Sequence, residues 1–139
     1  MIELKERFEH DKKMKALSMK QPVPELILEK KKTIETRTWK SDFLGEFYLH
    51  ASNNIIEDFV KRFELDKERL VKGAIVGRAE ITGLKVYNTL EEFNKDFNKH
   101  LVLEPKKLPM YGYILNNVQR LEKPIPLKGK LNFFEIKLW

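Results

Sequence analysis

Hydrophobic and polar residues alternate with a two-residue period in several short segments, and this period predicts β-strands. The alternation is clearest in Thr33–Trp39, where Ile34 and Thr36 fall on one side of the strand and Glu35 and Arg37 on the other. The same pattern predicts further strands at Met14–Met19, Gly45–Ala51, Gly73–Tyr87, Tyr111–Leu121 and Leu131–Leu138. Short strands of this kind, separated by helical segments, are typical of an α+β domain.

Three helices are predicted between these strands. The first has Pro22 in its opening turn, where a missing backbone donor is tolerated, and runs to about Lys31. Asn54 is expected to cap the second helix. Thr89, with Glu92 three residues later, forms a capping box that starts the third.

The arrangement of these elements favours a small mixed β-barrel over a doubly wound sheet. Gly77 and Gly83 interrupt the longest predicted strand, at positions where bulges would let a sheet curl. At 139 residues the chain is long enough for one domain with a core of its own. We expect residues 1–13 to be a helical N-terminal extension and residues 14–139 to be the domain.

The composition argues against several kinds of site. The chain has no cysteine, which excludes disulfides and thiol chemistry. His10, His50 and His100 are far apart in sequence, so we expect no metal and no other cofactor. Apolar runs are short and no signal-like segment starts the chain, which predicts a cytoplasmic protein without a membrane partner.

The positive charge is concentrated at the two ends of the sequence. Residues 1–40 carry 11 Lys/Arg against 7 Asp/Glu, and residues 106–139 carry 7 against 2. Residues 41–105 are acidic, with 9 against 12. If the first and last strands meet in space, one face would be basic, as polyanion binding requires. A well-solvated, lysine-rich surface explains the same numbers.

The segment around the first predicted helix and the next strand contains the best candidates for a functional site. Successive alternate residues of that strand are about 7 Å apart on one side. An ammonium, a guanidinium and an indole in one place suit a nucleotide, with phosphate on the cations and the base on the ring. The candidate residues are Lys20, Lys32, Glu35, Arg37, Trp39 and Lys40.

A purely structural interpretation of the same residues is open at this point. Glu35 and Arg37 can be a surface ion pair, which contributes little to stability. Trp39 can be a core residue, as tryptophans often are.

The segments Lys15–Pro22 and Lys32–Trp39 closely resemble the ASCH domain family of the PUA-like superfamily, which is also found in activating signal cointegrators. The similarity spans about residues 14–138. The family hallmark, Gly-x-Lys-x-x-Glu-x-Arg, is met here at Lys32, Glu35 and Arg37. The hallmark glycine is replaced by Lys30. A tryptophan that often follows Gln-Pro is Val23, so that stacking surface is missing.

The resemblance implies a β-barrel with a cleft that binds RNA or DNA, or a nucleoside or nucleotide ligand. In that case Lys20, Lys32 and Arg37 would contact phosphate, with Lys40 nearby. Glu35 would orient the cations or contact a base edge, and Trp39 would line the cleft.

An enzymatic function is the alternative. Some small relatives of ASCH domains hydrolyse the acyl amide of N4-acetylcytidine with a lysine and a threonine of this motif. Lys32 matches the lysine and would be the general base, since a desolvated lysine has a lowered pKa. The threonine position is Glu35, so the chemistry of such an amidohydrolase would have to differ. A nuclease is a third option, without a metal site or a pair of histidines to support it.

Overall fold

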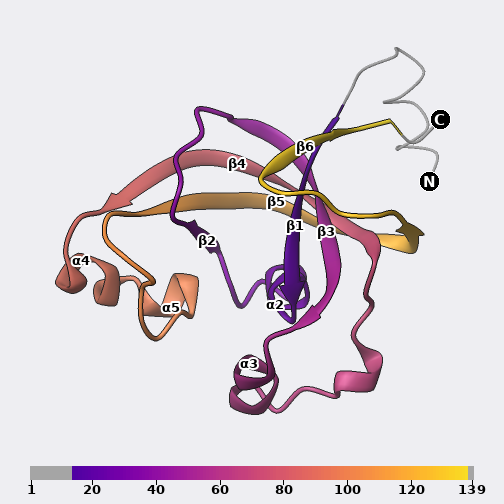
Figure 1. Cartoon of the computed structure of the whole chain (residues 1–139), viewed down its shortest axis with the longest axis horizontal. Helices are drawn as coiled ribbons and strands as arrows, with labels where there is room; N and C mark the ends of the chain where they lie inside the picture. Colours follow the sequence, from indigo (N-terminus) through magenta and orange to yellow (C-terminus); the bar gives the residue numbers. More distant parts are fainter. Residues whose placement is uncertain (1–13, 138–139) are drawn as a thin grey trace.

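A computed structural model shows one mixed six-stranded sheet with short helices at its sides (Figure 1). It describes residues 14–137, so the predicted N-terminal helix lies outside the described residues. The strands are β1 (Met14–Gln21), β2 (Ile34–Arg37), β3 (Gly45–Ile55), β4 (Ala74–Tyr87), β5 (Met110–Pro126) and β6 (Phe133–Ile136). The helices are α2 (Val23–Leu28), α3 (Glu57–Arg62), the 3-10 turn η1 (Lys67–Arg69), α4 (Leu90–Lys95) and α5 (Phe97–His100).

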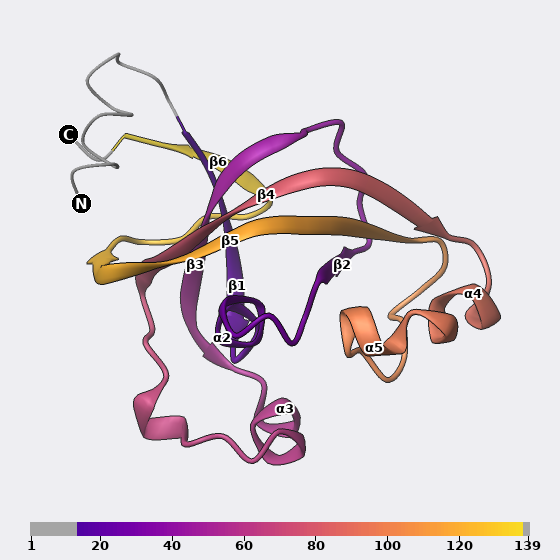
Figure 2. The ribbon, with the colours of Figure 1, turned by 180° about the vertical axis from the view of Figure 1, so that it is seen from behind.

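The strand order in the sheet is β2-β5-β4-β3-β1-β6. β1 and β3 are parallel, and all other neighbouring strands are antiparallel. β4 and β5 arch side by side over β2 and α2 in both views (Figures 1 and 2). Their register shifts just before Gly77 and again just before Gly83, which confirms the predicted irregularities in the long strand. β1 pairs with β6, so the first and last described strands do meet.

The sheet is not closed by hydrogen bonds within residues 14–137, and the predicted barrel is therefore not confirmed. β2 and β6 are its two edges and do not pair with each other. β2 has only four residues, and the chain leaves the sheet between Arg37 and Gly45. Side chains nevertheless cross the gap between the two ends of the sheet. Arg37 donates to the carbonyl of Ser18 in β1, and the Trp39 and Phe133 rings are 5.5 Å apart.

Apolar side chains fill both faces of the curved sheet. On the inner face, Leu17 and Leu49 pack with Leu26 and Ile27 of α2 and with Tyr113 of β5. The outer face has a smaller cluster of buried residues: Ala16, Tyr48, Ile75, Phe134 and Ile136. Tyr87, Phe93 and Met110 form a third cluster under α4. Helix α2 packs on the inner face, and the loop after it leads into β2 at the edge of the sheet.

Several predicted boundaries need correction. The first helix ends at Leu28 instead of Lys31, because Lys30 has a left-handed backbone with φ 63°. Asn54 does not cap the second helix, since it belongs to β3 and the N-cap is Ile56. The third helix begins as predicted, and the Thr89 side chain accepts a hydrogen bond from the backbone N–H of Glu92.

Candidate nucleic-acid interface

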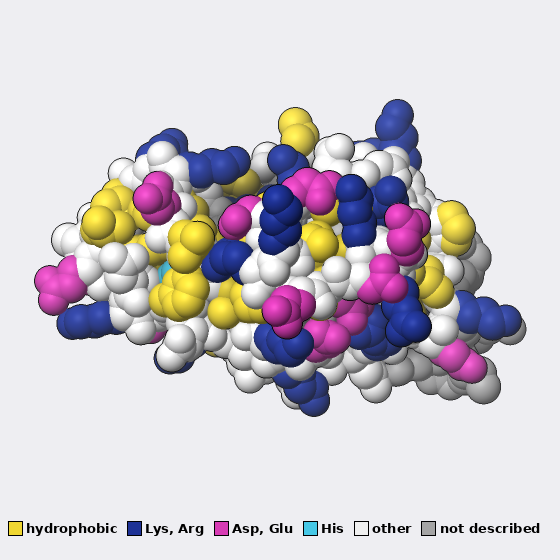
Figure 3. Space-filling model, turned by 90° about the horizontal axis from the view of Figure 1, so that it is seen from below, with side chains coloured by type: hydrophobic (Ala, Val, Ile, Leu, Met, Phe, Trp, Pro, Cys, Tyr) yellow, Lys and Arg dark blue, Asp and Glu magenta, His cyan; other side chains and the backbone are white. Residues whose placement is uncertain are grey.

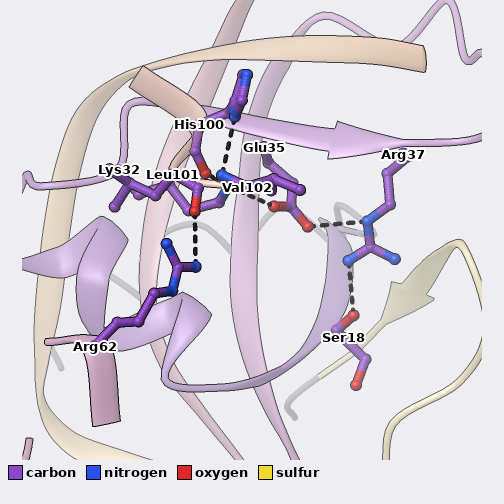
Figure 4. A network of polar contacts seen from close by, with 8 residues as sticks. All are labelled: Ser18, Lys32, Glu35, Arg37, Arg62, His100, Leu101 and Val102. Atoms are coloured by element: carbon purple, nitrogen blue, oxygen red, sulfur yellow. Dashed lines mark hydrogen bonds and ion pairs between the residues drawn. The ribbon is translucent and has the colours of Figure 1, made fainter. Parts of the chain in front are cut away.

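Lys32 lies just before β2 and is one of the most buried residues of the described chain, with 1% exposure. Its Nζ donates to the carbonyl of His100 and is 3.5 Å from Oε1 of Glu35 (Figure 4). Burial lowers the pKa of Lys32 below its ordinary value, although the negative charge of Glu35 opposes this shift. Lys32 is therefore an enclosed amine whose neighbours are a carbonyl and a carboxylate.

Three consecutive carbonyls at the C-terminal end of α5 hold this region together. The backbone N–H of Thr33 donates to the carbonyl of Lys99 at 2.8 Å, and Lys32 donates to that of His100. Arg62 of α3 donates to the carbonyl of Leu101 at 3.0 Å. The last carbonyls of a helix have no partner within the helix, and here the residues just before β2 and Arg62 of α3 supply donors to them. The sequence could not predict these contacts, because α3 and α5 are far apart along the chain.

Glu35 joins Lys32 to Arg37. Its Oε2 accepts from Nε of Arg37 at 2.9 Å, while Oε1 faces Lys32. Nη2 of Arg37 donates to the carbonyl of Ser18 at 3.0 Å. Within the described residues, Nη1 of Arg37 has no hydrogen-bond partner, and the side chain is 22% exposed. The guanidinium is thus fixed on two edges and retains donors for a ligand.

Trp39 combines both interpretations made from the sequence. Its ring packs against Tyr113 at 5.7 Å and Phe133 at 5.5 Å, so much of it is core. The Arg37 guanidinium lies 5.8 Å from the same ring, within cation–π range. The Tyr113 hydroxyl donates to the carbonyl of Trp39 and accepts from the N–H of Ser41, which fixes this loop. Trp39 therefore supports the position of Arg37 from outside β2.

The structure brings together Lys32, Glu35, Arg37 and Trp39, but not the two remaining candidates. Lys20 and Lys40 are exposed, and no contact of either with the other four is among those described. In β1, Lys20 alternates with the buried residues Met19 and Gln21. Its side chain therefore lies on the face opposite the inner core. Arg62 and Ser18 belong to the network although neither was predicted as a site residue. The sequence signal at Arg62 is its place beside Phe59 and Phe63, over whose rings its guanidinium lies.

The face of the molecule that carries the helices has mixed charge. Seen from below, where the helices lie, Lys and Arg side chains are interspersed with Asp and Glu (Figure 3). Hydrophobic side chains gather at the end of this face that carries α4 and α5. Anion binding on this face would consequently depend on the orientation of individual cationic side chains and not on a continuous basic patch.

Two features that residues 14–137 lack bear on the type of site. Residues 14–137 contain no group of three or more His, Cys, Asp or Glu side chains placed to hold a metal ion. No helix among them has the length and hydropathy needed to span a membrane.

Comparison with known proteins identifies the family. The family model for the ASCH domain matches residues 17–125, which includes the whole Lys32–Arg37 network. The chain belongs to the ASCH domain family. This family has a PUA-like fold, of the type found in RNA-binding proteins. No curated protein matches this ASCH domain.

Solved structures confirm the fold of this ASCH domain. The crystal structure of ASCH from Zymomonas mobilis matches with a TM-score of 0.61 and 14% identity, over 82% of this chain and 73% of that one. A single-substitution variant of the Zymomonas mobilis protein matches with a TM-score of 0.62 and 14% identity, over 84% and 77%. A second variant matches with a TM-score of 0.61 and 15% identity, over 84% and 76%.

Proposed function

We propose that this ASCH domain is a nucleic-acid-binding module whose ligand is RNA, and that Arg37 is its central phosphate contact. The observation that supports this most is the state of the Arg37 guanidinium. Glu35 and the Ser18 carbonyl fix Nε and Nη2, and Nη1 is left for a ligand. A guanidinium held in this way loses little side-chain entropy on binding and matches the geometry of a phosphate.

The charges of the network favour an anionic ligand. Lys32 and Glu35 are both buried and balance each other as an ion pair. The positive charge of Arg37 is therefore not fully neutralised by its own carboxylate partner. Lys32 is enclosed in this arrangement, so in our proposal it acts through Glu35 and does not touch phosphate.

The remaining candidate residues have supporting roles in the proposal. Trp39 holds the Arg37 side chain against its ring, and Lys40 follows it on the exposed loop. Lys20 is on another face and contributes to the long-range attraction of a polyanion. RNA is the favoured ligand because the family fold is of the type that binds RNA.

Binding of a labelled single-stranded RNA of about ten nucleotides, a length within the range bound by single-strand-binding folds, tests this proposal. Fluorescence anisotropy would be measured at low salt for the wild type, Arg37→Gln and Arg69→Gln. We expect the Arg37 change to weaken binding about tenfold, the effect of losing a charged hydrogen bond. Arg69 is the control, because it is 88% exposed and its described ion pair is with Asp66 in its own turn. Equal affinities for all three proteins would contradict the proposal.

A second candidate function is supported by the burial of Lys32. An amine whose pKa is lowered by burial can act as a general base, here beside the carboxylate of Glu35. The corresponding activity is the amidohydrolysis of an N4-acylated cytidine-type nucleoside. It predicts release of acetate from N4-acetylcytidine by the wild type and loss of that activity in Lys32→Met. No release by folded wild-type protein would eliminate this candidate and leave RNA binding unaffected.

A further inference from the structure

Arg62 has the same kind of environment as Arg37, although it comes from α3. Its Nε donates to Oδ2 of Asp58 at 3.1 Å, and Nη2 donates to the carbonyl of Leu101 at 3.0 Å. Within residues 14–137, its Nη1 has no hydrogen-bond partner, and the side chain is 21% exposed. The guanidinium lies 4.4 Å from the centre of the Phe59 ring.

Each feature has its counterpart at Arg37. There Nε binds a carboxylate, Nη2 binds a backbone carbonyl, Nη1 has no partner in the described part of the chain, and an aromatic ring lies beside the guanidinium. The two arginines are also joined through the same network. Arg62 binds the carbonyl of Leu101, and the adjacent carbonyl of His100 binds Lys32. Figure 4 shows the guanidiniums at the two ends of this network, with Lys32 and residues 100–102 between them.

We infer that Arg62 is a second phosphate contact, so that a single strand of RNA lies along the network from α3 to β2. This rests on the function proposed above for Arg37. Two fixed guanidiniums on one hydrogen-bonded network suit a ligand with more than one phosphate, because each provides donors to a separate anion. The ligand is consequently an oligonucleotide, and a mononucleotide occupies the Arg37 end alone.

The carboxylate partners of the two arginines differ in a way that makes this inference testable. The Glu35 side chain is buried and also faces Lys32, whereas the Asp58 side chain is 65% exposed and binds Arg62 alone among the described ion pairs. The negative charge of Asp58 therefore opposes the approach of a phosphate to Arg62. Removal of its charge is expected to strengthen oligonucleotide binding.

The experiment compares two probes on one set of variants. The probes are a single-stranded RNA of about ten nucleotides, and adenosine 5′-monophosphate as its competitor. The variants are Arg62→Gln and Asp58→Asn, with Arg69→Gln and Asp66→Asn as controls. The controls remove the same charges from an exposed ion pair of similar sequence spacing, in which Nε of Arg69 and Oδ2 of Asp66 are 3.5 Å apart. Thermal unfolding verifies that each variant folds.

We expect Arg62→Gln to lower the affinity for the oligonucleotide about tenfold and to leave the affinity for the mononucleotide unchanged. We expect Asp58→Asn to raise the affinity for the oligonucleotide alone. Equal weakening of both probes by Arg62→Gln would show that Arg62 only supports the network, and would overturn the inference. Loss of binding in Arg37→Gln without any effect of Arg62→Gln or Asp58→Asn would also overturn it, but would leave the proposed function standing. Failure of the wild type to bind either probe would overturn both. If Arg62→Gln does not fold, Asp58→Asn decides the result, since it alters an exposed side chain.

Discussion

Glu35 in β2 and Asp96 between α4 and α5 are both buried carboxylates. Each forms an ion pair with a lysine and accepts a hydrogen bond from a second side chain. Oδ2 of Asp96 accepts from Lys85 and from the Tyr87 hydroxyl, both at 2.6 Å. Tyr87 is fully buried and its single O–H is used here, but the Lys85 side chain is 47% exposed. At Glu35 the positions are reversed: Lys32 is enclosed, and the second donor, Arg37, is partly exposed, with no partner for its Nη1 among residues 14–137. The two carboxylates therefore differ in which cation faces outward, the lysine at Asp96 and the arginine at Glu35.

The largest effect is expected from Glu35→Gln. This change leaves Lys32 enclosed without a negative partner and releases Arg37 at the same time. Loss of one member of a buried ion pair destabilises a protein by about 3 kcal/mol or more. The free energy of unfolding from urea denaturation measures this loss, and RNA affinity should fall with it. A stability within error of the wild type would show that Lys32 does not depend on Glu35.

Asp96→Asn should separate the two regions. It removes the charge that binds Lys85 and weakens the contact with Tyr87, at a cost of about 1.5–3 kcal/mol for a charged hydrogen bond. Among the described contacts the Asp96 carboxylate does not bind Lys32, Glu35 or Arg37, and its backbone carbonyl, which accepts from the N–H of His100, is unchanged by the substitution. RNA affinity should therefore be unchanged in protein that is still folded. A loss of affinity equal to that of Glu35→Gln would remove the distinction between the two carboxylates.

The same carboxylate predicts how stability depends on pH. Burial raises the pKa of Asp96, but hydrogen bonds from Lys85 and Tyr87 outweigh it, so its pKa is lowered in the folded protein. A group with a lowered folded pKa contributes stability above its unfolded pKa of about 4, and this contribution is lost as the pH falls through the folded value. Unfolding measured between neutral pH and pH values below about 4 should therefore show a smaller acid loss in Asp96→Asn than in the wild type. Parallel pH profiles would contradict this assignment.

The smallest predicted effect concerns the backbone that leads into β2. Lys30 has a left-handed backbone with φ 63°, a conformation that costs residues with a side chain more than glycine. Lys30→Gly should therefore stabilise the domain by about 0.5–1 kcal/mol, after the greater flexibility of glycine in the unfolded chain is taken into account. Thermal and urea denaturation measure this gain in the free energy of unfolding. RNA affinity should remain the same, because the Lys30 side chain is exposed and makes no described contact with the network.

Much of the local structure was predictable from the sequence. Alternation placed Glu35 and Arg37 on one side of a strand, and they do form an ion pair on β2. Thr89 caps its helix as predicted, by accepting from the backbone N–H of Glu92. The resemblance to the ASCH domain family is confirmed over most of the chain. These features depend on residues close together in sequence, or on a motif that extends over a few positions.

The features that were missed depend on distant contacts. Lys32 is buried with its amine on the carbonyl of His100, 68 positions away, and a local pattern cannot reveal such a contact. The failure of Asn54 as a cap has a similar cause. β3 continues to Ile55, and the N–H of Ile56 donates to the carbonyl of Gln21, so the helix starts later. The open sheet was missed because strand alternation contains no information on whether the edges of a sheet pair.

The salt dependence of RNA binding tests the central claim most directly. The logarithm of the affinity for a single strand falls with the logarithm of salt concentration with a slope of about −0.7 per phosphate contacted. Titration of the wild type and of Arg37→Gln against one RNA at several salt concentrations gives both slopes. We predict that loss of Arg37 makes the slope shallower by about 0.7. Identical slopes for the two proteins would contradict the claim that Arg37 binds phosphate.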